Sequence, residues 1–258
     1  MFPAVNFSYF TLAGYLIFLG MIADVLDGHI ARISKSTSSF GAQLDSLCDV
    51  ITFGVAPAFL MSKMIEAYSQ YAQFARNNFV LIPERIVLLI AIVYVMCAII
   101  RLARFNVENK NDDTHLGFVG LPSPSAAGML VSIIVFQQDF LPRISRWHSG
   151  SVADGFTMVT FWVLPCVALL VGILMVSRIP FPHALNSILR GKKRFSTFLL
   201  ILFVLPLMIW NIQLTMVLGF SGFALFGVIR WLFAKTFFRK KKAAETEQQN
   251  EDNLGSDI

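Results

Sequence analysis

The chain has 258 residues, of which 56% are hydrophobic and only 14% are charged, and its mean hydropathy is +0.66. A soluble domain of this size needs a charged shell, so this composition excludes that class and indicates an all-α polytopic membrane protein. The net charge of +5 is explained by basic loops that lie against anionic lipid headgroups, and we expect no nucleic-acid partner. The three cysteines have neither disulfide nor metal-ligand spacing.

Apolar stretches of about 20 residues, which can cross a hydrocarbon core of about 30 Å, predict seven membrane helices. They cover residues 6–23, 47–66, 85–101, 124–140, 156–177, 196–211 and 213–233. We therefore expect one membrane domain over residues 1–235. Residues 236–258 are basic at first and then acidic and polar, which predicts a disordered cytoplasmic tail. We expect no signal peptide, because the first apolar stretch carries no basic leader and no small-residue cleavage site.

The distribution of basic residues predicts the orientation of these helices. If the loop after the first helix is cytoplasmic, 15 of the 21 Lys and Arg residues lie in cytoplasmic segments and five in the outside segments. Cytoplasmic loops are enriched in Lys and Arg, so this orientation is the favoured one. It places the aspartate-rich segment after the first helix on the cytoplasmic side.

Four aspartates within 26 residues form the most informative pattern in the sequence. Asp24 and Asp27 are three residues apart, and Asp45 and Asp49 are four apart, so each pair shares one helix face. Four carboxylates that converge near a membrane surface repel one another and lose hydration, which bound cations relieve. Oxygen ligands in this number suit Mg²⁺, Mn²⁺ or Ca²⁺ and do not suit zinc. Two such ions beside a phosphate form the clamp used for in-line displacement at phosphorus.

Small residues and one arginine accompany the aspartates. Gly28 and Ala31 lie on the helix of the first pair, where they let a ligand approach the backbone closely. Arg32 adds a planar donor fork that suits phosphate oxygens. Gly41 extends the face of the second pair with a position that has no side chain. Two aspartates alone at a helix end are usually a cap or a solvated face, but the combined pattern favours an active site at the cytoplasmic helix ends.

The pattern D-x-x-D-G-x-x-A-R, eight further residues and G-x-x-x-D-x-x-x-D, from Asp24 to Asp49, resembles the signature of the CDP-alcohol phosphotransferase family. The resemblance implies that the aspartates hold two divalent cations, Mg²⁺ or Mn²⁺, and that Asp49 acts as the base. It also implies that a hydroxyl attacks phosphorus and CMP leaves. The positions that would face the nucleotide pyrophosphate are Asp24, Gly28, Ala31, Arg32 and Gly41.

Residues 40–57, 101–106 and 118–128 resemble the phosphatidylserine synthase branch of that family. This implies CDP-diacylglycerol and L-serine as substrates, a lipid environment in the bacterial cytoplasmic membrane, and a homodimer. The carboxylate of serine needs a cation, for which Arg101 and Arg104 are the candidates. Either one could instead be an ordinary positive-inside residue. Residues 120–124 could form a rigid pocket wall, but a helix-entry turn with Pro at its first positions is favoured locally.

Three alternatives remain. The same chemistry on glycerol 3-phosphate or inositol phosphate would require a denser basic pocket than Arg101 and Arg104 provide. A cation transporter would carry its carboxylates near the middle of its helices, and an inactive scaffold would not need the intact signature. Members of the family carry one more membrane helix before the aspartate-bearing one, so we expect either a truncated start or a missing helix.

Overall fold

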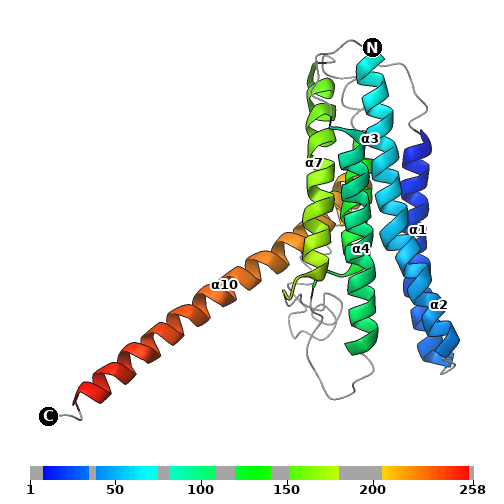
Figure 1. The fold of residues 1–258 in the computed structure, drawn as a ribbon. Coiled ribbons are helices and arrows are strands. Elements are labelled where there is room, and N and C mark those ends of the chain that lie inside the picture. The colour runs from blue at the N-terminus through cyan, green and yellow to red at the C-terminus, as the bar shows by residue number, and fades with distance from the viewer. Residues whose placement is uncertain are drawn as a thin grey trace.

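The computed structural model describes residues 8–34, 39–74, 82–108, 120–140, 151–179 and 205–255, and the regular elements in these ranges are helices. They are α1 (Ser8–Ser34), α2 (Ser39–Asp49), η1 (Val50–Val55), α3 (Ala56–Phe74), α4 (Glu84–Glu108), α5 (Ser123–Val135), η2 (Phe136–Phe140), α7 (Ser151–Val176) and α10 (Ile212–Gly255). The two η elements are π-helical turns that continue neighbouring α-helices. Figure 1 shows α1, α3, α4 and α7 running along a common bundle, while α10 extends away from it.

Within the described ranges, five helices are long and apolar enough to cross a membrane, so the chain is a polytopic membrane protein as predicted. The spans are Tyr9–Ile30, Gln43–Ser69, Glu84–Val107, Val159–Val176 and Ile212–Phe233. They correspond to five of the seven predicted helices. The predicted helix 124–140 is present as α5 followed by η2 but is not one of these five spans. Of the predicted helix 196–211, residues 196–204 lie outside the described residues.

The predicted boundaries of the first two helices are wrong at the ends that carry the aspartates. The first helix was expected to end at residue 23 but continues to Ser34, and the second begins at Ser39 instead of residue 47. The prediction stopped at the first charged residue, whereas charged side chains end an apolar stretch without breaking the backbone hydrogen bonds of a helix. All four aspartates therefore lie within helices.

The last helix continues beyond its membrane span. α10 runs from Ile212 to Gly255, through most of the segment for which the sequence predicts a disordered tail. Residues 240–249 are rich in Lys, Ala, Glu and Gln, which are good helix formers. The division of the chain at residue 235 stays a prediction.

Helix α5 forms the centre of the described bundle, and small residues let its neighbours approach it. A Cβ atom added to Gly14 of α1 would lie 2.4 Å from Val135 of α5. A Cβ atom added to Gly128 of α5 would lie 2.4 Å from the ring of Phe220 on α10. Close packing at small residues is the main attraction between helices in lipid, where burial of apolar surface gains little.

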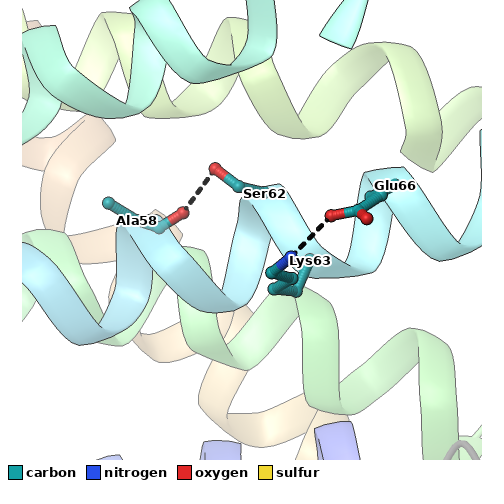
Figure 2. A network of polar contacts seen from close by, with 4 residues as sticks. All are labelled: Ala58, Ser62, Lys63 and Glu66. Carbon is teal, nitrogen blue, oxygen red and sulfur yellow. Dashed lines mark hydrogen bonds and ion pairs between the residues drawn. The ribbon is translucent and has the colours of Figure 1, made fainter.

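An apolar groove of about 660 Å³ lies between α3 and α4, with charged side chains along part of its wall. Figure 2 shows that Lys63 donates a hydrogen bond of 2.8 Å to Glu66 and that Ser62 donates one of 2.9 Å to the carbonyl of Ala58. The i,i+3 pair neutralises two charges within a membrane span. None of the predicted site residues lines this groove.

Polar side chains join four elements at the end of the bundle away from the aspartates. Tyr15 of α1 donates to the Asp139 carboxylate at 3.2 Å, and the Gln213 amide of α10 donates to the same oxygen at 3.0 Å. Nearby on η2, the amide of Gln138 donates to the hydroxyl of Tyr68 on α3 at 3.0 Å. These bonds satisfy polar groups inside the apolar bundle.

Candidate active site

The fold brings the two halves of the aspartate motif together. The side chains of Asp24 on α1 and Asp49 at the end of α2 lie close enough to interact directly, although they are 25 residues apart. Asp45 interacts electrostatically with both, and Asp27 interacts with Asp24. All four predicted aspartates therefore belong to one cluster.

That this cluster holds divalent cations stays a prediction. Asp24 and Asp49 are partly buried, whereas Asp27 and Asp45 are exposed. Two carboxylates that lie so close repel each other, and a cation beside them would relieve that repulsion. Carboxylate oxygens from two helices suit Mg²⁺ or Mn²⁺. Among the residues that the structure describes, no three His, Cys, Asp or Glu side chains lie close enough together to hold one ion.

The positions predicted to face the nucleotide lie on the same helices as the aspartates. Gly28 is exposed on α1, and a Cβ atom added there would meet nothing within 4 Å. Gly41 is exposed on α2. Ala31 and Arg32 lie in the last turns of α1, and their side chains lie outside the described part of the structure. Open space beside Gly28 leaves room for a ligand, and the contacts of these four residues with a nucleotide stay a prediction.

Arg101 on α4 faces the aspartate cluster from inside the bundle. Its side chain is only 9% exposed, and its Nη1 donates a hydrogen bond to the Ser123 hydroxyl at the start of α5. Arg101 also attracts Asp49 electrostatically. Whether Arg101 and Arg104 bind the serine carboxylate or are ordinary positive-inside residues stays a prediction. Arg104, one turn later, donates to the Val176 carbonyl at 3.3 Å.

The segment before α5 is fastened to the end of α7. The N–H of Gly120 donates to the Ile179 carbonyl at 2.9 Å, and the N–H of Leu121 donates to the Leu174 carbonyl at 3.1 Å. Gly120 has φ +93°, and a Cβ atom there would lie 2.4 Å from the Met175 carbonyl oxygen. The first turn of α5 contains a proline, so the predicted helix-entry turn is confirmed.

Two polar contacts of the site were not predicted from the sequence. Ser123 is fully buried and accepts the hydrogen bond from Arg101. Asn106, near the end of α4, donates to the Ser46 hydroxyl at 2.9 Å and so links α4 to α2 between two of the aspartates. Both residues belong to stretches that resemble one branch of the family, but no local pattern shows which side chain each one meets.

Comparison with known proteins gives the family. A profile of the CDP-alcohol phosphatidyltransferase family matches residues 1–163. A Helicobacter pylori protein named CDP-diacylglycerol–serine O-phosphatidyltransferase is 33% identical over 91% of this chain and 86% of its own length. Proteins with the same name from Methanocaldococcus jannaschii and Bacillus subtilis are 35% and 34% identical, over 67% and 65% of this chain and 65% and 72% of their own lengths. No solved structure matches the chain. The family match covers both halves of the aspartate motif, and the chain belongs to the CDP-alcohol phosphatidyltransferase family.

Proposed function

We propose that the chain transfers the phosphatidyl group of CDP-diacylglycerol to L-serine, forming phosphatidylserine and releasing CMP. The observation that carries this proposal is the cluster in which Asp24 contacts Asp49 while the buried Arg101 attracts Asp49. A base and a cation beside each other suit an acceptor that has both a hydroxyl and a carboxylate. The printed name of the Helicobacter pylori relative supports serine as that acceptor.

In the proposed reaction, Asp49 takes the proton of the serine hydroxyl as the oxygen forms its bond to phosphorus. The bond between that phosphorus and the CMP oxygen breaks, and CMP leaves. Arg101 binds the serine carboxylate with a planar donor fork, and Arg104 adds a second positive charge one turn away. Ser123 accepts one N–H of Arg101 and so keeps the guanidinium directed toward the cluster.

Two divalent cations, Mg²⁺ or Mn²⁺, complete the proposed site. Their ligands would be Asp24, Asp27, Asp45 and Asp49, whose carboxylate oxygens suit these ions. When bound, such ions neutralise the negative charge that develops on the pyrophosphate oxygens. The nucleotide would lie along the side of the cluster formed by Asp24, Gly28, Ala31, Arg32 and Gly41.

We further propose that the site faces the cytoplasm in a bacterial cytoplasmic membrane, because that orientation places 15 of the 21 basic residues inside. The full set of membrane helices would number seven, with α5 and η2 as one of them. A homodimer and a cytoplasmic tail over residues 236–258 belong to the same proposal.

Purified protein with CDP-diacylglycerol and Mn²⁺ or Mg²⁺ tests the function through CMP release with a panel of acceptors. We expect release with L-serine, no release with glycerol 3-phosphate or inositol phosphate, and loss of release in EDTA that either cation restores. Release with one of the phosphorylated acceptors and not with serine would overturn the acceptor assignment. Cation flux into vesicles without any CMP release would favour a transporter instead.

A further inference from the structure

A π-helical turn follows directly after Asp49 and separates the aspartate helix from α3. In this turn, η1, the backbone N–H at Ala56 bonds to the carbonyl of Ile51, five residues earlier instead of four. The sequence explains its position. Pro57 has no N–H to offer the carbonyl of Phe53, four residues earlier, and its ring crowds that oxygen. A π turn widens the helix by one residue and relieves the crowding.

Tyr94 of α4 supplies the donor that Pro57 cannot. Its hydroxyl donates a hydrogen bond of 2.9 Å to the Phe53 carbonyl, and the Tyr94 side chain is fully buried. One residue along, Gly54 packs against Ala98 on the next turn of α4, where an added Cβ atom would lie 3.3 Å from the Ala98 Cβ atom. The π turn is therefore anchored to α4 by a hydrogen bond and by close backbone packing.

The π turn decides which way Asp49 faces. Asp49 and the fully buried Met61 of α3 are 12 residues apart, so in an unbroken α-helix their directions would differ by about 120°. A turn that absorbs one extra residue reduces this difference to about 20°. The exposure pattern agrees, because Asp49 is partly buried and Phe53 is 1% exposed, while Leu47 and Ile51 are 62% and 60% exposed.

We infer that Tyr94 is a positioning residue, which holds the π turn open so that Asp49 faces Asp24 and Arg101. This inference rests on the proposed role of Asp49 as the base. Tyr94 itself meets no substrate in this scheme. It acts by binding the Phe53 carbonyl, which keeps the π turn and thereby sets the direction in which the Asp49 side chain faces.

The first test is Tyr94→Phe, which removes only the hydroxyl. We expect kcat for CMP release to fall at least tenfold with the KM for serine within about twofold, because the base is misdirected while Arg101 is untouched. We also expect a lower Tm, since a buried carbonyl loses its donor, and a smaller rise in Tm on adding Mn²⁺. Tyr68→Phe is the matched control, because it removes a hydrogen-bonded tyrosine hydroxyl near the other end of α3. It should leave kcat and the Mn²⁺ response unchanged.

The double variant Tyr94→Phe with Pro57→Ala separates positioning from stability. Alanine at 57 offers the missing N–H to Phe53 in an ordinary α-helical turn, so Tm should recover relative to Tyr94→Phe. The activity should stay low, because the α-helical turn directs Asp49 away from the cluster. A variant that only lost stability would recover both.

Each outcome has a definite consequence. Wild-type kcat in Tyr94→Phe, or recovery of kcat together with Tm in the double variant, would overturn the positioning role and leave the proposed function standing. If the wild-type protein releases no CMP with any acceptor, the proposed function fails. The Mn²⁺-dependent Tm shift of Tyr94→Phe then tests the positioning role alone, and an unchanged shift would refute it.

Discussion

Replacing Ser123 by alanine tests whether the buried arginine binds the acceptor. Ser123 accepts a hydrogen bond from Arg101, and both side chains are buried between α4 and α5. The variant leaves one donor of a buried guanidinium unsatisfied without changing the charge. Arg101 would then turn toward other acceptors and lose its orientation beside Asp49.

A hydrogen bond to a buried charged group contributes about 1.5–3 kcal/mol. If this energy orients Arg101 for serine binding, the KM for serine rises about 10- to 150-fold. We expect the KM for CDP-diacylglycerol to change little, because the nucleotide would lie along the other helices of the site. Initial rates of CMP release, measured over a serine titration at saturating CDP-diacylglycerol, give both parameters.

Ser132→Ala is the matched control for this experiment. Ser132 is equally buried on the same helix but donates to the Met129 carbonyl of its own helix at 3.0 Å. It should alter Tm slightly and leave the KM for serine unchanged. The reasoning fails if Ser123→Ala keeps the wild-type KM, or if both serine variants raise it equally.

Two further substitutions test the base and the joint before α5. Asp49→Asn should lower kcat about 100- to 10,000-fold, which is the contribution of a general base, and should retain the wild-type Tm. The control Asp139→Asn, at the other end of the bundle, should keep the wild-type kcat. Full activity in Asp49→Asn would refute the mechanism. Gly120→Ala should cost at least about 1–2 kcal/mol of stability and lower Tm, because φ is +93° and the Met175 carbonyl oxygen lies 2.4 Å from the new Cβ atom. Gly219→Ala, with nothing within 4 Å of its Cβ position, should leave Tm unchanged or raise it, and equal losses in the two variants would contradict the argument.

Much of the bundle could be predicted because membrane spans are a local property of the sequence. A span needs about 20 apolar residues in succession, and five predicted spans match helices in the described residues. The ends of the helices follow less directly from hydropathy. The first expected helix ended at residue 23, before the first charged side chain, yet the backbone of α1 remains helical to Ser34 and its apolar span extends to Ile30.

The candidate site was predicted as two separate faces. The spacing of Asp24 with Asp27, and of Asp45 with Asp49, follows from the helical repeat alone. The motif also carried the family resemblance, which the comparisons confirm. That the two faces meet was inferred from the chemistry of converging carboxylates, and in the structure the side chains of Asp24 and Asp49 interact directly.

The sequence by itself determined the membrane class, most of the spans and the family, because apolar length and motif spacing are read along one segment at a time. Only the tertiary structure decided which side chains support that motif. Ser123 meets Arg101 across two helices, and Tyr94 meets the Phe53 carbonyl from another helix. Such contacts depend on how separate helices rotate and pack, which the helical repeat of a single segment does not specify. The direction of Asp49 depends on both the sequence and the tertiary structure, because Pro57 determines where the π turn forms and contacts with α4 stabilise it.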